Sequence, residues 1–162
     1  RYYKMIYRDA FGRLEDFSEK TFEALYPLAE KENPSNPDIT YAQYLLSWVQ
    51  TFNYQRAGNI NDSDFTSPLA AICGQGNDCD SRSMLLSILL NSIDVESILL
   101  FSIDYSHAMA ATNIKAPGQT YKLEENQKEY IFGETTDNVT WGMIVQDQSD
   151  RSKWIPVTFF QD

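Results

Sequence analysis

The chain has 162 residues, which is enough for one compact domain and too short for two ordinary ones. Apolar side chains make up 43% of it and aromatic side chains 14%, a content that excludes wholesale disorder. Thirteen basic against twenty-three acidic side chains give a formal net charge of −10. Nucleic acids and anionic bilayers are bound through basic surfaces, so neither is expected as a partner. No apolar run approaches the ~20 residues of a membrane span, and we expect no membrane insertion in this segment.

A single histidine, His107, and two cysteines, Cys73 and Cys79, limit the available chemistry. Any reaction that needs an imidazole must use His107. Two cysteines exclude a disulfide scaffold and a four-cysteine zinc module, and they are either free or bridged. The compartment therefore stays open, with an extracytoplasmic location (periplasmic, secreted or envelope-anchored) favoured. The chain begins at Arg1 without Met or a signal-like segment, as a trimmed or processed product would.

The N-terminal half has helical patterning. Apolar residues at helical spacing predict a helix over 14–30, and the two prolines of 33–37 end it. Asp38 is a suitable N-cap for a second helix that runs to about Phe52, and the polar residues 53–64 predict a loop. Aromatic side chains near the N-terminus are expected to be core or interdomain contacts: Tyr2, Tyr3, Tyr7 and Phe11.

A turn with two glycines, residues 74–78, leads into the most apolar segment of the chain. From Ser83 to Ile93 apolar side chains cover nearly the whole helical circumference, which is typical of a buried helix. Cys79 is therefore expected at the N-terminus of a central helix. Small polar side chains form its one polar stripe and would allow close approach of another element: Ser83, Ser87 and Asn91.

Strand patterns follow this helix, over 95–103, 107–114, 128–133 and 154–160. No crossover helix separates them. Helices followed by consecutive strands predict an α+β fold with a mostly antiparallel sheet, in a single domain that spans 1–162.

A cysteine is a useful nucleophile as its thiolate, and a helix N-terminus favours that anion by roughly 0.3–2 kcal/mol. Asp78 and Asp80 flank Cys79 and oppose its ionisation, so a histidine is needed as well. His107 begins one predicted strand and Glu134 ends another. In an antiparallel hairpin with these two residues opposite each other, their Cβ atoms are about 4.5–5.5 Å apart. The carboxylate then fixes the imidazole tautomer and stabilises the imidazolium.

Four local motifs stand in order along the chain. They are the Gly-Asn-Asp-Cys-Asp turn of 76–80, the link of 91–95, the strand opened by His107, and the Gly-Glu-Thr-Thr of 133–136. With the lead-in segment before them, they resemble the transglutaminase-like branch of the papain-type cysteine enzymes over about residues 40–145. The third position holds Glu134, where the family more often has aspartate.

This resemblance implies a papain-like, transglutaminase-core fold and a cysteine-dependent hydrolase or acyl transferase acting on peptide or amide bonds. Cys79 would be the nucleophile, His107 the base and Glu134 the residue that orients it, with Asp137 as its rival. Compact bacterial relatives of this type favour hydrolysis. The expected partner is a protein or peptide substrate, no cofactor is needed, and the oligomeric state stays open.

Several alternatives remain beside this reading. Cys79 is a buried structural thiol in a catalytically silent binding module, or it is silenced by a bridge to Cys73. A zinc site formed by both cysteines, His107 and a carboxylate is a third possibility. In the enzyme, the backbone N–H of Cys79 is one oxyanion donor, and three side chains are candidates for the second: Tyr54, Gln75 and Asn77.

Overall fold

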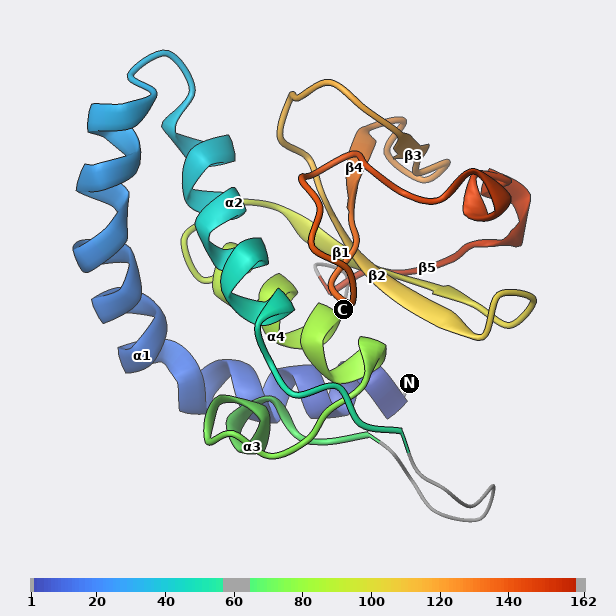
Figure 1. The fold of residues 1–162 in the computed structure, drawn as a ribbon, viewed down its shortest axis with the longest axis horizontal. Helices are drawn as coiled ribbons and strands as arrows, with labels where there is room; N and C mark the ends of the chain where they lie inside the picture. Colours follow the sequence, from blue (N-terminus) through green and yellow to red (C-terminus); the bar gives the residue numbers. More distant parts are fainter. Residues whose placement is uncertain (1, 57–64, 160–162) are drawn as a thin grey trace.

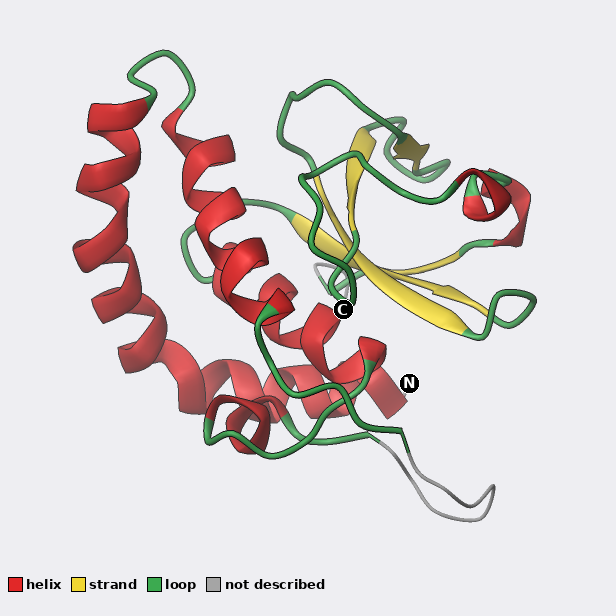
Figure 2. Ribbon diagram, viewed as in Figure 1, coloured by secondary structure: helices red, strands yellow, loops and turns green. Residues whose placement is uncertain are grey.

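The computed structural model describes residues 2–56 and 65–159. Helices precede strands along the chain, and the helices pack beside the sheet (Figures 1 and 2). The helices are α1 (Tyr2–Glu32), α2 (Pro37–Gln50), α3 (Pro68–Ile72) and α4 (Cys79–Asn91), with 3-10 turns η1 (Gln146–Gln148) and η2 (Arg151–Lys153). The strands are β1 (Ser97–Ser102), β2 (His107–Thr112), β3 (Thr120–Lys122), β4 (Glu129–Gly133) and β5 (Ile155–Val157).

One sheet contains all five strands of the described residues, in the order β3-β4-β2-β1-β5. Every neighbouring pair in it is antiparallel. The predicted α+β class, with N-terminal helices, a buried central helix and an antiparallel sheet, is confirmed. None of the helices in the described part of the chain is long and apolar enough to cross a membrane.

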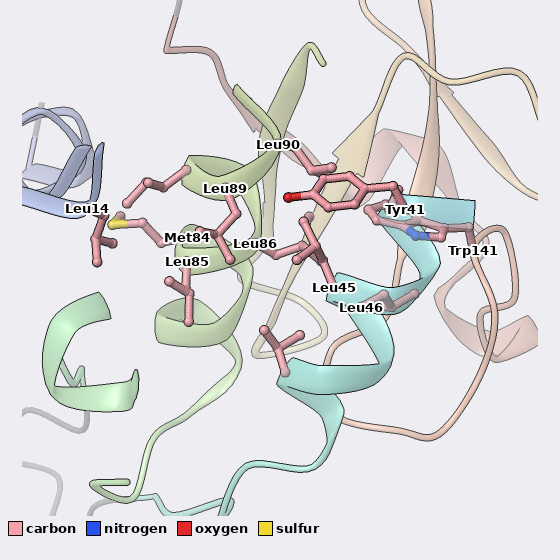
Figure 3. Close-up of a cluster of buried hydrophobic side chains, with 14 of the residues drawn as sticks. Leu14, Tyr41, Leu45, Leu46, Met84, Leu85, Leu86, Leu89, Leu90 and Trp141 are labelled. Atoms are coloured by element: carbon pink, nitrogen blue, oxygen red, sulfur yellow. The ribbon is translucent and has the colours of Figure 1, made fainter. Parts of the chain in front are cut away.

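The central helix is α4, which contacts the other three helices and strands β1 and β2. Met84 points toward Leu14 of α1, while Leu90 lies near Tyr41 of α2 (Figure 3). Each of these side chains is at most 4% exposed. A helix enclosed on both sides must be apolar nearly all round, which explains its sequence pattern.

The polar stripe of α4 faces the sheet. Ser83 Oγ donates to the Ala108 carbonyl at 3.3 Å and Ser87 Oγ to that of Ile98 at 3.4 Å. Asn91 binds the backbone of Ser97 through both its amide nitrogen and its oxygen. Small side chains therefore let the sheet approach α4 closely, as predicted.

The helix boundaries differ from those predicted. The first helix begins at Tyr2 rather than at residue 14, because buried Tyr7 and Ala10 continue its apolar stripe toward the N-terminus. Asp38 is not an N-cap: the second helix begins at Pro37, and Asp38 accepts a hydrogen bond from the Tyr26 hydroxyl at 2.7 Å. Proline favours the first helical turn, which moves the start forward. Of the predicted loop, 57–64 lies outside the described residues.

Gly133, the last residue of β4, lies against the indole of Trp141. A Cβ built on Gly133 would be 2.4 Å from Cζ3 of Trp141, a ring that is itself buried. We expect Gly133→Ala to reduce the free energy of unfolding by roughly 1–3 kcal/mol through overpacking. Thermal unfolding measures the loss. Gly12→Ala is the control, because its Cβ meets no atom within 4 Å and alanine favours the helix. Equal stability of the two variants would contradict the prediction.

Candidate active site

Cys79 is the first residue of α4. Asp78 is the N-cap, and its carboxylate accepts hydrogen bonds from the Ser81 amide at 3.0 Å and the Ser81 hydroxyl at 2.6 Å. The Cys79 side chain packs with Leu99 and Ala108 and is 2% exposed. The backbone N–H of Ala108, the residue after His107, donates a hydrogen bond to its sulfur. The start of α4 and the start of β2 therefore meet at this sulfur.

The surroundings of the Cys79 thiol favour its neutral form. Burial raises its pKa to about 12, with the Asp80 and Asp78 carboxylates adding to the rise and the Ala108 N–H opposing it. Its Sγ lies 3.4 Å from Oδ1 of Asp80. The other Asp80 oxygen accepts a hydrogen bond from the Tyr3 hydroxyl, and the Tyr3 ring packs against the cluster that contains Cys79. A thiol with this pKa keeps its proton at neutral pH.

His107 and Glu134 form a close pair. Nε2 of His107 is 2.7 Å from Oε2 of Glu134, and the two side chains are 11% and 9% exposed. The other Glu134 oxygen accepts hydrogen bonds from the amide and the hydroxyl of Thr136, each at 2.7 Å. Burial alone would raise the pKa of Glu134, but hydrogen bonds from His107 and Thr136 outweigh it and hold the pKa below its ordinary value. Because Nε2 is engaged, Nδ1 is the ring nitrogen left for other chemistry.

The predicted register of this pair is wrong by two residues. That register would place Ala108 opposite Gly133, whereas β2 and β4 pair Ala110 with Gly133. Glu134 therefore lies diagonally from His107 rather than directly opposite. A shift of two residues keeps each side chain on its face of the sheet, so the two still meet. The predicted register rests on placing His107 and Glu134 directly opposite each other. Because β3 lies between β2 and β4 along the chain, no short hairpin turn joins these two strands and fixes their register.

A cavity of about 510 Å³ opens beside the imidazole. Asp137, the rival third residue, is exposed on its wall and accepts a hydrogen bond from the Asn138 amide. Further residues that line this cavity are Tyr54, Arg56, His107, Glu134, Met143 and Val145. The cavity thus gives solvent access to the histidine–glutamate pair, while the thiol is buried.

The three candidates for the second oxyanion donor differ in their hydrogen bonds and in their exposure to the cavity. Asn77 is committed to the turn, because its oxygen accepts a hydrogen bond from Arg82 Nε at 2.6 Å and its nitrogen donates to the Gln75 carbonyl at 2.9 Å. Gln75 is exposed and does not line the cavity. Tyr54 lines it together with His107. Of the three side chains, Tyr54 is therefore the one that shares a cavity with His107.

Cys73 is exposed, Cys79 is buried, and both are free thiols, so this structure contains no bridge between them. In the described residues no group of three or more His, Cys, Asp or Glu side chains is arranged to hold a metal ion. The zinc site considered above has no such ligand set here. Sequence reasoning missed Arg82, which is 1% exposed. Its place among polar residues at the start of α4, between Ser81 and Ser83, gives no local signal of burial.

Comparison with known proteins gives distant structural likeness alone. No family model matches the sequence, and no curated protein matches it. A structure of EGTA-treated LapG from Legionella pneumophila is similar with 15% sequence identity and a TM-score of 0.49, over 91% of this chain and 79% of that one. A calcium-bound form of LapG has 17% identity and a TM-score of 0.46, over 92% and 81%.

Proposed function

We propose that this protein is a transglutaminase-like, papain-type cysteine enzyme that cleaves or transfers peptide or amide bonds. Cys79 is the nucleophile, His107 the general base and acid, and Glu134 the residue that orients the imidazole. The observation that carries the proposal is the His107–Glu134 hydrogen bond at 2.7 Å. His107 directly precedes Ala108 on β2, and the amide of Ala108 binds the Cys79 sulfur.

The chemistry follows from the protonation states. The neutral thiol gives its proton to Nδ1 of His107 as sulfur attacks the carbonyl carbon, and ionised Glu134 stabilises the imidazolium. The oxyanion is stabilised by the free backbone N–H of Cys79 at the start of α4 and by the Tyr54 hydroxyl. His107 then protonates the leaving amine, and a thioester remains on Cys79. Water releases this acyl group as a carboxylic acid, whereas a lysine amine would form a cross-link.

Hydrolysis is the favoured outcome, following the resemblance to compact bacterial relatives. A peptide or protein substrate suits the cavity, since its rim presents the exposed apolar side chains of Met143 and Val145 close to the polar pair. An extracytoplasmic location remains a prediction of the sequence.

Alkylation of Cys79 by iodoacetamide tests the proposal without a known substrate. The measurement is made in a Cys73→Ser background, because Cys73 is an exposed thiol that would also react. We expect stoichiometric labelling near neutral pH, seen as an intact-mass shift, and a rate at least about tenfold lower in His107→Ala, because the imidazole accepts the thiol proton. Cys79→Ser in the same background is the control and should take up no label.

A catalytically silent module is the second candidate, and one observation favours it: the raised pKa of the buried thiol. In that case Cys79 would label no faster than a small-molecule thiol, and His107→Ala would leave the rate unchanged. This result would overturn the enzyme proposal.

A further inference from the structure

Arg82 is a buried cation in the second turn of α4, three residues after Cys79. Its guanidinium donates to three neutral oxygens. Nε donates to the side-chain oxygen of Asn77 at 2.6 Å, Nη2 to the Phe52 carbonyl at 2.6 Å, and Nη1 to the Thr135 carbonyl at 3.1 Å. Burying a charge is costly unless its donors are all satisfied, and a similar apolar residue would pack at lower cost. The retention of a charge here therefore calls for an explanation.

The acceptors of Arg82 belong to three segments that build the candidate site. Asn77 lies in the turn before the nucleophile, and Thr135 directly follows Glu134. Phe52 lies just beyond the end of α2, and two residues later the ring of Tyr54 sits under the guanidinium at 5.2 Å. A planar cation with five N–H groups can bind all of these at once, whereas a lysine ammonium cannot.

The backbone links two of these segments directly as well. A parallel bridge pairs Tyr54 with Asn77, with the Gln55 amide donating to the Asn77 carbonyl at 2.9 Å and the Asn77 amide to the Asn53 carbonyl at 3.1 Å. The hydrogen bond from Arg82 to the Thr135 carbonyl joins the segment after β4 to the Tyr54 and Asn77 segments. Arg82 is therefore an anchor shared by the end of β4 and the turn before Cys79.

We propose that Arg82 is a positioning residue, which holds the Cys79 turn, the Tyr54 ring and the Glu134 end of β4 in one fixed arrangement. This inference rests on the proposed function, since it assigns a role relative to the same nucleophile, base and oxyanion donor.

The charge of Arg82 supports the same role. Burial lowers its pKa from the ordinary value, while the neighbouring acidic groups, Tyr54, Asp78, Cys79 and Glu134, act in the opposite direction. A guanidinium keeps its proton in proteins. A fixed positive charge beside these groups favours the thiolate of Cys79 and the carboxylate of Glu134, and it opposes the effect of Asp78 and Asp80.

Two variants test this role in the Cys73→Ser background. Arg82→Lys keeps the positive charge but loses the planar, multi-donor guanidinium. Asn77→Ala removes the side-chain oxygen that accepts the hydrogen bond from Arg82 Nε, and it adds no volume to the buried site. For both, we expect the rate of iodoacetamide labelling of Cys79 at neutral pH to fall between about tenfold and 100-fold, as for a misplaced reacting group. The midpoint of the pH–rate profile should move to higher pH, because the turn that carries Cys79 loses its shared anchor with the end of β4, where Glu134 binds His107.

Ile88→Val, a buried change farther along α4, is the matched control. It lowers stability without touching the site, and it should leave the labelling rate and its pH profile as in the parent protein. If Arg82→Lys does not fold, as judged by circular dichroism, Asn77→Ala decides the question.

Folded variants with the parent rate and pH profile would overturn the positioning role. Failure of the proposed function gives a different result, since labelling of the parent protein would then be independent of His107.

Discussion

Replacing Glu134 with aspartate is expected to lower the rate of Cys79 alkylation at neutral pH by about tenfold or more, although the negative charge is kept. The reason is reach. Continuing the β2–β4 register beyond Ala110 and Gly133 places Glu134 opposite Met109, two residues from His107. Diagonal neighbours of this kind are about 7–8 Å apart, a span that suits a long side chain. Aspartate is one methylene shorter and would lose the 2.7 Å contact with Nε2.

Glu134→Gln keeps the length of the side chain and removes its negative charge. Its carboxamide can still reach His107, but it does not stabilise an imidazolium as a carboxylate does, so we expect a loss of comparable size. Asp137→Asn is the control on the same cavity, because Asp137 is exposed. Alkylation rates from intact mass measure all three. A normal rate in Glu134→Asp together with a low rate in Asp137→Asn would move the orienting role to Asp137.

The outcome for this pair shows what the sequence could predict. Strand alternation fixes which face a side chain occupies, so the pairing of His107 with Glu134 was predictable even from a register that was wrong by two residues. No turn geometry fixes the register, because β3 (Thr120–Lys122) lies between β2 and β4 along the chain and no short hairpin turn joins them.

Arg82 shows what the sequence could not predict. Local patterning treats a charged residue in a helix as solvated, and two of the three oxygens that accept hydrogen bonds from this one belong to Phe52 and Thr135, 30 and 53 positions away. In contrast, Cys79 at the start of a buried helix followed from the glycine turn and the apolar run alone. Strong local patterns predicted the helices and strands, and strand alternation placed His107 and Glu134 on one face, whereas no pattern predicted the long-range contacts of Arg82.

Asp80→Asn is expected to have the opposite effect to the substitutions above and to accelerate labelling of Cys79. The thiol pKa is raised to about 12 by burial first and by Asp80 next, so at neutral pH little thiolate exists before proton transfer. Removing the carboxylate 3.4 Å from the sulfur lowers that pKa. Each unit of decrease multiplies the thiolate fraction by about tenfold.

The pH–rate profile of iodoacetamide labelling, recorded in the Cys73→Ser background, measures this change as a shift of its midpoint to lower pH. Asp16→Asn is the matched control, because it removes an exposed α1 carboxylate paired with Lys20. Tyr3→Phe distinguishes the effect of the Asp80 charge from the effect of burial under α1. It removes the hydroxyl that donates a hydrogen bond to the Asp80 carboxylate and leaves the aromatic ring in place. If charge dominates, Tyr3→Phe does not accelerate labelling. If Tyr3→Phe matches Asp80→Asn, anchoring of α1 over the thiol, rather than the Asp80 charge, limits the reactivity of Cys79.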